Sequence, residues 1–270
     1  MSNKISIMVK RLNLPTRAFG AEPQVPDRAM LADWIAEHRG RLADINTYRL
    51  DQSLAPQLPA GIGTPCAGGR FYAERIRDCI EGITENRATG ELHADTPDII
   101  EDAAAIVVQK KDAWCAMPAP HALGILDEYY CDADEWNDAI CGIYRTLMRT
   151  MRDTGVPGHV LIVEKASNPE LVALAGQKAF FFSPKPDRET LAGILEHQQQ
   201  VAITSKRLET LFDLMNEYTV RKIFLLDPDA TAIGLARTHF DPDQIVGAGY
   251  CTDECDAYWK GVVERSVYVR

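Results

Sequence analysis

The chain has 270 residues, of which 46% are hydrophobic and 25% are charged, and its formal net charge is -10 with a pI near 5.1. This composition is typical of a soluble globular protein, and the acidic balance argues against nucleic acid or an anionic membrane as the main partner. No run of 18 consecutive apolar residues occurs, and the first residues are too poor in apolar side chains for a secretory signal. We therefore expect a cytoplasmic protein.

The first predicted elements alternate with long loops. Lys4 to Val9 alternates between apolar and polar residues, which predicts an opening strand. Asp27 is placed to cap a helix that ends near Gly40. The segment from Ser53 to Gly69 is rich in proline and glycine, so we expect a loop or lid there.

Two helices and a hairpin are predicted between residues 70 and 153. Apolar residues at intervals of three and four predict a helix from about Arg70 to Ile83. Two short apolar runs, Ala103 to Val108 and Ala113 to Met117, flank a polar tetrapeptide and predict a β-hairpin. The strongest helical stripe of the chain runs from Asp134 to Asp153.

From Gly158 to Cys251 the chain repeats one unit about five times: a short apolar run, a turn and an amphipathic stretch. The runs start about 20 residues apart, the length of a strand plus a short crossover helix. This rhythm predicts an α/β fold with a mostly parallel sheet of about five or more strands and flanking helices, Rossmann-like or flavodoxin-like. Five units are too few for an eight-unit barrel, and the first half lacks the rhythm to supply the rest. The runs are Val160 to Val163, Ala179 to Phe182, Val201 to Ile203, Lys222 to Leu226 and Ile245 to Val246.

No composition break demands a domain boundary. Residues 1–155 form a loop-rich α+β part that includes the predicted hairpin, and residues 156–270 hold the regular repeat, so we expect one compact domain. Polar residues that follow the strands are placed to cap the next helices. These are Asn168, Asp187, Thr204 or Ser205, and Asp229.

In a parallel sheet the ligand crevice lies beyond the carboxyl ends of the strands. The polar residues and cysteine that close each run are therefore the candidates for a binding site. They are Glu164, Lys165, Ser183, Lys185, Thr204, Lys206, Asp227, Asp229, Tyr250 and Cys251.

Three lysines are the most suggestive set. Lys165, Lys185 and Lys206 each lie within a few residues of a strand end, where helix starts already favour anions, and together they are candidates to hold a phosphate or carboxylate. The alternative is that they are solvated lysines in exposed loops. Asp227 closes a buried run and is a candidate to orient a ligand or transfer a proton, although a turn accounts for it equally.

Cysteine and histidine supply the remaining candidates. The seven cysteines contain no C-x-x-C pair, which favours reduced thiols over a disulfide framework. Cys251 and Cys255 lie four positions apart after the last strand. They are either two unrelated thiols or a functional pair that binds a metal, undergoes a redox cycle or supplies a nucleophile. His121 lies in a loop rich in titratable groups and is a candidate acid or base, whereas His159 begins a strand and is assigned a structural role.

The chain contains no P-loop, dinucleotide fingerprint or common hydrolase signature, so no cofactor and no reaction are named. The leading hypothesis is a protein that binds a small anionic molecule bearing a phosphate or carboxylate at the carboxyl edge of its sheet. It favours an enzyme, although the sequence does not establish catalysis. One alternative is a thiol-based metal or redox accessory protein that uses Cys251 and Cys255. Another is a non-catalytic regulatory or partner-binding domain. The oligomeric state is not predicted.

Overall fold

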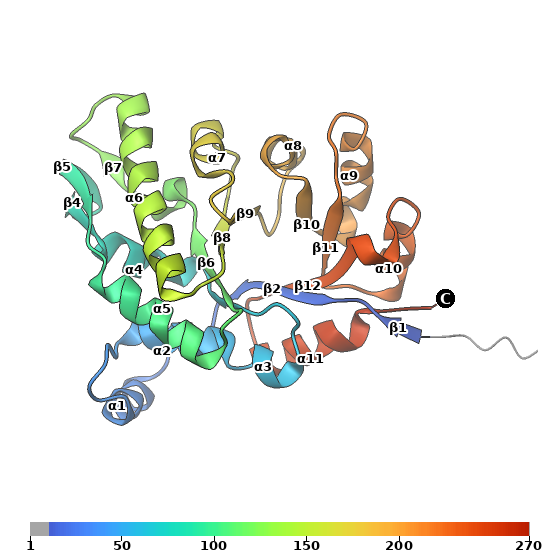
Figure 1. The fold of residues 1–270 in the computed structure, drawn as a ribbon, viewed down its shortest axis with the longest axis horizontal. Helices are drawn as coiled ribbons and strands as arrows, with labels where there is room; N and C mark the ends of the chain where they lie inside the picture. Colours follow the sequence, from blue (N-terminus) through green and yellow to red (C-terminus); the bar gives the residue numbers. More distant parts are fainter. Residues whose placement is uncertain (1–10, 270) are drawn as a thin grey trace, which may run out of the picture.

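A computed structural model describes residues 11–269, so the strand predicted from Lys4 to Val9 lies outside the described residues. The fold is mixed α/β with flanking helices, as predicted, and parallel strands form its centre (Figure 1). These strands are β2 (Thr16–Ala21), β3 (Cys66–Gly68), β6 (Trp114–Pro118), β8 (His159–Ile162), β9 (Ala179–Phe182), β10 (Gln200–Thr204), β11 (Lys222–Leu226) and β12 (Ile245–Cys251).

The parallel strands belong to two four-stranded sheets, with the orders β3-β6-β8-β9 and β10-β11-β12-β2. The sheets meet where Ala18 N donates to Thr64 O at 2.9 Å and Thr64 N donates to Thr16 O at 2.9 Å, just before β3. At the opposite seam, between the edge strands β9 and β10, the side chain of Gln198 hydrogen-bonds the backbone N and O of Phe181, each at 2.9 Å. The strands therefore follow one another in chain order, as in a β/α barrel that is open between β9 and β10.

This strand order differs from those of a Rossmann-like or flavodoxin-like sheet, in which the order reverses at a switch point. The first half of the chain supplies β2, β3 and β6, of which only β6 was predicted as a strand, in the run from Ala113 to Met117. β3 has only three residues, which is too short for a periodic pattern. With β2, β3 and β6 added to the five predicted units, the described chain has eight strands in these two sheets, so the expectation that too few strands exist for a barrel is wrong.

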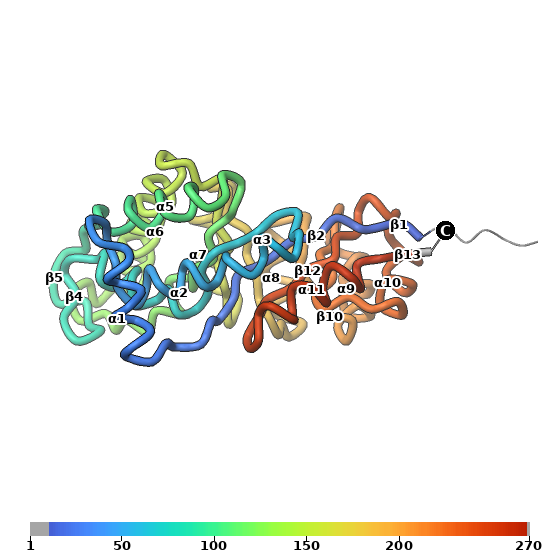
Figure 2. The backbone as a smooth tube through the Cα atoms, turned by 90° about the horizontal axis from the view of Figure 1, so that it is seen from below, coloured from blue at the N-terminus to red at the C-terminus, as the bar shows by residue number. Residues whose placement is uncertain are grey.

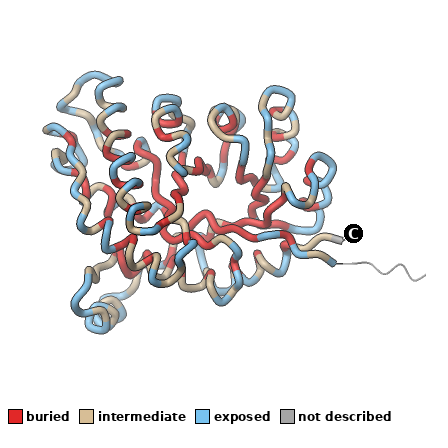
Figure 3. Tube along the Cα trace, viewed as in Figure 1, coloured by how far each residue is buried: buried red, intermediate tan, exposed pale blue. Residues whose placement is uncertain are grey.

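One buried cluster fills the space between the two sheets. The ring of Phe19 on β2 lies 4.9 Å from that of Phe182 on β9 and 5.3 Å from that of Phe224 on β11. Phe180 lies 5.0 Å from Phe19 and 5.3 Å from Phe224. The strands accordingly form the buried centre of the molecule in Figure 3. Because side chains from both sheets meet here, the sheets share one core.

Helices cover the outside of the strands. In Figure 1, α7, α8 and α9 lie on one side of the strands, and α3 and α11 lie on the opposite side. None of the helices in the described part of the chain is long and apolar enough to cross a membrane. The helices are α1 (Arg28–Glu37), α2 (Ile45–Leu54), α3 (Gln57–Ala60), α4 (Ala73–Asp78), α5 (Pro97–Gln109), α6 (Ala133–Thr154), α7 (Asn168–Leu174), α8 (Arg188–His197), α9 (Leu208–Leu214), α10 (Ala230–Ala236) and α11 (Cys255–Arg265).

Several predicted helix starts are present. Asp27 accepts from Met30 N, Asp187 from Thr190 N and Asp229 from Ala232 N, at 2.7 to 2.8 Å. These bonds satisfy amides that the first helical turn leaves free. The other two predicted caps differ: Asn168 is the first residue of α7 rather than its cap, and Thr204 makes no capping hydrogen bond through its side chain.

The predicted hairpin at 103–117 is wrong. The first of its apolar runs belongs to α5, whose residues Ile99, Ala103 and Ile106 are buried at helical spacing, and the second run is β6. A hairpin exists earlier, between β4 (Ile80–Thr84) and β5 (Arg87–Ala94), and it shortens the helix predicted for residues 70–83. The predicted loop at 53–69 contains α3 and β3.

Short strands and 3-10 turns lie around the central strands and at the ends of the molecule. Figure 2 shows the β4–β5 hairpin at one end of an elongated body and β1 at the other. There β1 pairs antiparallel with β13 and so joins the two ends of the described chain. The short elements are β1 (Arg11–Asn13), β7 (Leu126–Asp127), β13 (Val267–Val269) and the 3-10 turns η1 (Arg70–Tyr72), η2 (Pro120–Leu123), η3 (Ser205–Arg207) and η4 (Pro242–Gln244).

Candidate functional site

A pocket of about 540 Å³ lies over the carboxyl ends of β9, β10, β11 and β12. It opens at the seam between the two sheets, where β9 and β10 are not joined in one ladder. Because parallel strands deliver their last residues to one edge, four loops contribute to this pocket. The lining residues are Phe182, Pro184, Lys185, Thr204, Ser205, Lys206, Arg207, Leu226, Asp227, Tyr250 and Thr252.

Three cationic side chains line one part of this pocket. Lys185 lies in the loop after β9, and Lys206 and Arg207 belong to the turn η3 after β10. All three are exposed, so the pocket is open to water on this side. The buried side chains of Phe182 and Leu226 form an apolar part of the lining. Such a site combines positive charges with an apolar wall, the usual composition of a small-molecule pocket.

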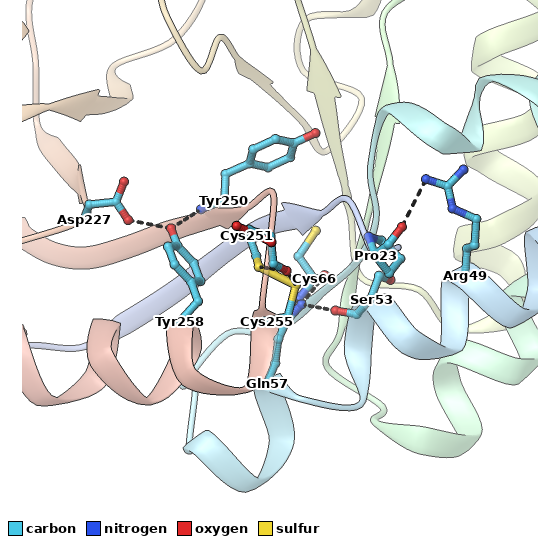
Figure 4. Close-up of a disulfide and its surroundings, with 11 residues drawn as sticks. Pro23, Arg49, Ser53, Gln57, Cys66, Asp227, Tyr250, Cys251, Cys255 and Tyr258 are labelled. Carbon is cyan, nitrogen blue, oxygen red and sulfur yellow. Dashed lines mark hydrogen bonds between the residues drawn. A yellow bond between two sulfur atoms is a disulfide. The ribbon is translucent and has the colours of Figure 1, made fainter. Parts of the chain in front are cut away.

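Asp227, which directly follows β11, lines the same pocket. Its backbone has φ 48°, a left-handed conformation that is uncommon for a residue other than glycine. Asp227 N donates to Ala248 O at 2.9 Å, and a carboxylate oxygen accepts from Tyr258 Oη at 2.6 Å. Tyr258 Oη in turn accepts from Tyr250 N at 2.9 Å (Figure 4). Burial, followed by the charge of Asp227, raises the pKa of Tyr258, so this hydroxyl stays protonated and fixes the carboxylate.

A second tyrosine–carboxylate pair joins the ends of β12 and β2. The hydroxyl of Tyr250 donates to Glu22, which also accepts from Arg70 N at 2.6 Å. Burial and the charge of Glu22 raise the pKa of Tyr250. The ring of Tyr250 lies 5.4 Å from that of Phe182, so this residue forms part of the pocket wall. The two tyrosines thus hold the strand ends around the pocket in one arrangement.

Thr204 also lines this pocket, whereas the remaining predicted residues lie outside it. Lys165 follows β8 and is exposed; it contributes to the lowered pKa of Asp187, whose main cause is the hydrogen bond from Thr190 N. Ser183 is buried, and Asp229 caps α10. Of the three predicted lysines, the structure therefore brings two together.

His121 belongs to a separate group after β6. Its Nδ1 lies 2.7 Å from a carboxylate oxygen of Glu170, and its Nε2 accepts from Glu164 N at 3.3 Å. With Nε2 accepting, Nδ1 carries the proton and donates it to Glu170. Both ring nitrogens are therefore occupied within the protein.

Cys251 and Cys255 are joined by a disulfide, which corrects the expectation of reduced thiols at these two positions. The turn between β12 and α11 brings their Cα atoms to 5.8 Å, within the span of a disulfide. The sulfurs are therefore bonded to each other, and no group of three or more His, Cys, Asp or Glu within residues 11–269 is arranged to hold a metal ion. The free cysteines are Cys66, Cys79, Cys115, Cys131 and Cys141.

Sequence reasoning missed three residues of the site. Arg207 comes directly after Lys206. It therefore also lies just beyond a strand end, which is the criterion (the strand-end rule) by which Lys206 was selected. Glu22 directly follows β2, a strand that was not predicted. Tyr258 comes from a helix that packs back on the sheet, and its contact with Asp227 joins residues 31 positions apart. Only the strand-end rule was available to find the first of these.

Comparisons with known proteins bear on the fold. Protein-family models and curated protein sequences give no match to this chain. Among solved structures, it is similar to a B12-independent methionine synthase from Shewanella sp. W3-18-1 in complex with selenomethionine, with a TM-score of 0.64 and 14% identity over 94% of this chain and 96% of that chain. A putative vitamin-B12 independent methionine synthase from Listeria monocytogenes has a TM-score of 0.57 and 14% identity over 94% and 93%. This likeness shows a shared α/β fold.

Proposed function

We propose that this protein binds a small molecule bearing a phosphate or carboxylate in the pocket over β9 to β12. The observation that carries the proposal is the convergence of Lys185, Lys206 and Arg207, from two different loops, on one pocket. An anion bound in this pocket is attracted by all three positive charges. A volume of about 540 Å³ lies within the range of small-molecule sites.

We further propose that the protein is an enzyme. The two structural neighbours are named as methionine synthases, and one of them was solved with a small molecule bound. In this chain, the left-handed backbone of Asp227 is the kind of local strain that gathers at functional sites. Asp227 and its partner Tyr258 are the candidates to orient the ligand or to accept a proton from it.

Calorimetric titration with inorganic phosphate tests the anion site. The double variant Lys185→Ala/Lys206→Ala removes two of the three cations, and each exposed charge contributes about 1 kcal/mol or less to binding. We expect phosphate affinity to fall about tenfold in the double variant.

A matched control separates the pocket from general electrostatics. Lys222 begins β11 at the amino edge of the sheet, so Lys222→Ala removes one positive charge far from the pocket lining. We expect this variant to bind phosphate with an affinity within about twofold of the wild type, because screening limits the reach of an isolated charge. The single variant Lys206→Ala removes the same amount of charge within the pocket lining. If Lys222→Ala and Lys206→Ala lost the same phosphate affinity, phosphate binding would depend on net charge alone, and the proposed site would be wrong.

A further inference from the structure

The disulfide between Cys251 and Cys255 has one accessible end. Cys251 is the last residue of β12 and is buried, whereas Cys255 begins α11 and is partly exposed. A cavity of about 460 Å³ is lined by Cys255 together with residues that follow β2, including Pro23 and Gln24. A small thiol that enters this cavity reaches Cys255.

The turn is built to hold these sulfurs in the reduced state as well. The carbonyl oxygen of Asp253 lies 3.2 Å from Cys255 Sγ and 3.3 Å from Cys251 Sγ. Once reduced, each thiol has this oxygen as a hydrogen-bond acceptor. Cys255 also stands at the start of an 11-residue helix, where free amides stabilise a thiolate. Reduction therefore leaves no sulfur without a polar partner.

We propose that Cys251 and Cys255 form a reversible dithiol/disulfide site, reduced by a neutral or cationic thiol compound, whose state controls one wall of the candidate pocket. The acidic side chains of Asp253, Glu254 and Asp256 line the cavity beside Cys255 and disfavour an anionic reductant. This charge pattern selects the chemical class of the reductant.

The exchange balances with a dithiol as the reductant. Its thiolate attacks Cys255 Sγ, the S–S bond breaks, and Cys251 leaves as a thiolate that takes up the proton lost by the attacking thiol. The second thiol of the reductant then attacks the reductant's first sulfur, which is bonded to Cys255 in the mixed disulfide, and Cys255 leaves as a thiol. The reductant loses two electrons and two protons and becomes a disulfide, and the protein gains two thiols.

The disulfide is linked to the pocket through the residues on either side of it. Tyr250 immediately precedes Cys251, and its N–H donates to Tyr258 on α11, which donates to Asp227 (Figure 4). The disulfide fixes the start of α11 against the end of β12, which keeps Tyr258 within reach of both partners. Opening it frees this end of α11 to move. The effect on ligand binding rests on the proposed function, whereas the redox chemistry does not.

Alkylation of the full chain counts the cysteines that are reduced. The protein is treated with dithiothreitol while it remains folded, as monitored by circular dichroism, and is then denatured in iodoacetamide for mass measurement. We expect five labels before treatment, one for each free cysteine, and seven after it. Failure to reach seven labels before the protein unfolds would overturn the reversible site.

Hydrogen exchange measures the effect on the pocket wall without any ligand. We expect the amide of Tyr250 to exchange at least tenfold faster after reduction, while the amide of Phe224 in the core of β11 stays unchanged. The variant Cys251→Ser/Cys255→Ser should show the faster exchange with or without dithiothreitol. Equal exchange at Tyr250 in both states would overturn the control of the wall.

Two further measurements separate this inference from the proposed function. The disulfide should be reduced several-fold faster by cysteamine, which is cationic, than by 2-mercaptoethanesulfonate, and the reverse order would overturn the assigned reductant class.

Phosphate should bind several-fold more weakly to the reduced protein. Equal binding to both forms would overturn the control of the pocket and leave the anion site intact, and absence of phosphate binding in both forms would contradict the anion site alone.

Discussion

His159 shows how burial can act on stability rather than on function. It begins β8, it is fully buried, and both of its ring nitrogens lack a hydrogen-bond partner in the described part of the chain. Burial, with a smaller contribution from the charge of Arg152, lowers the pKa of His159 from 6.5 to about 3. The structural role predicted for this residue agrees with its position at the amino edge, away from the pocket.

The sign of the resulting pH dependence follows from linkage. Between pH 6.5 and about 3 the unfolded chain binds a proton at His159 and the folded chain does not, so stability is present above pH 6.5 and falls as the pH is lowered. We expect the burial of His159 to lower the free energy of unfolding by about 2 kcal/mol when the pH falls from 7 to 5. The free energy of unfolding in urea should therefore decrease less over this interval in His159→Met than in the wild type, with pH 8 as the reference. Parallel curves for the two proteins would contradict the lowered pKa.

Among the elements, the seam between β9 and β10 is the most distinctive. The side chain of Gln198 accepts from Phe181 N and donates to Phe181 O, and it also donates to Gln200 O at 2.8 Å. It therefore takes the place of a neighbouring strand for one residue. The pocket opens beside this seam, so the seam influences both stability and the shape of the site.

Replacement of Gln198 tests this role. Gln198→Ala leaves two backbone groups of Phe181 without their partner, which we expect to lower the free energy of unfolding by about 1 to 3 kcal/mol. Urea unfolding measures the loss, and the neighbouring Gln199→Ala, at an exposed position, should change it by less than about 0.5 kcal/mol. If the two variants had the same free energy of unfolding, the hydrogen bonds of Gln198 at the seam would not contribute to stability.

Elements with a long periodic pattern could be predicted from the sequence. The stripe of α6 is buried as expected, because a 22-residue helix repeats its apolar face many times. A run such as Ala103 to Val108 fits a helix or a strand equally well, and its packing as part of α5 decided the outcome. Short strands such as β3 carry no local signal, and their place depends on contacts with distant residues.

At the scale of the whole molecule, the strand order decides which predicted residues meet. Five of the polar residues predicted from the strand ends line one pocket, because β9 to β12 are consecutive in the chain. They are Lys185, Thr204, Lys206, Asp227 and Tyr250. Lys165 obeys the same rule but follows β8, where the pocket does not extend. Contacts such as that between Tyr258 and Asp227 depend on how a helix returns to the sheet, which no local pattern records.

The charge of the whole molecule gives the pocket its significance. The chain carries a formal net charge of -10, which disfavours the approach of anions to the molecule as a whole. The cations at the ends of β9 and β10 are a local exception, and they make the carboxyl edge the expected place for an anion to bind.

Crystals soaked in tungstate, a heavy-atom analogue of small oxyanions, test the localisation most directly. The account predicts an anomalous peak between Lys185, Lys206 and Arg207, and its loss in crystals of Lys185→Ala/Lys206→Ala. Peaks only at other surfaces, or an unchanged peak in the double variant, would contradict an anion site at this edge of the sheet.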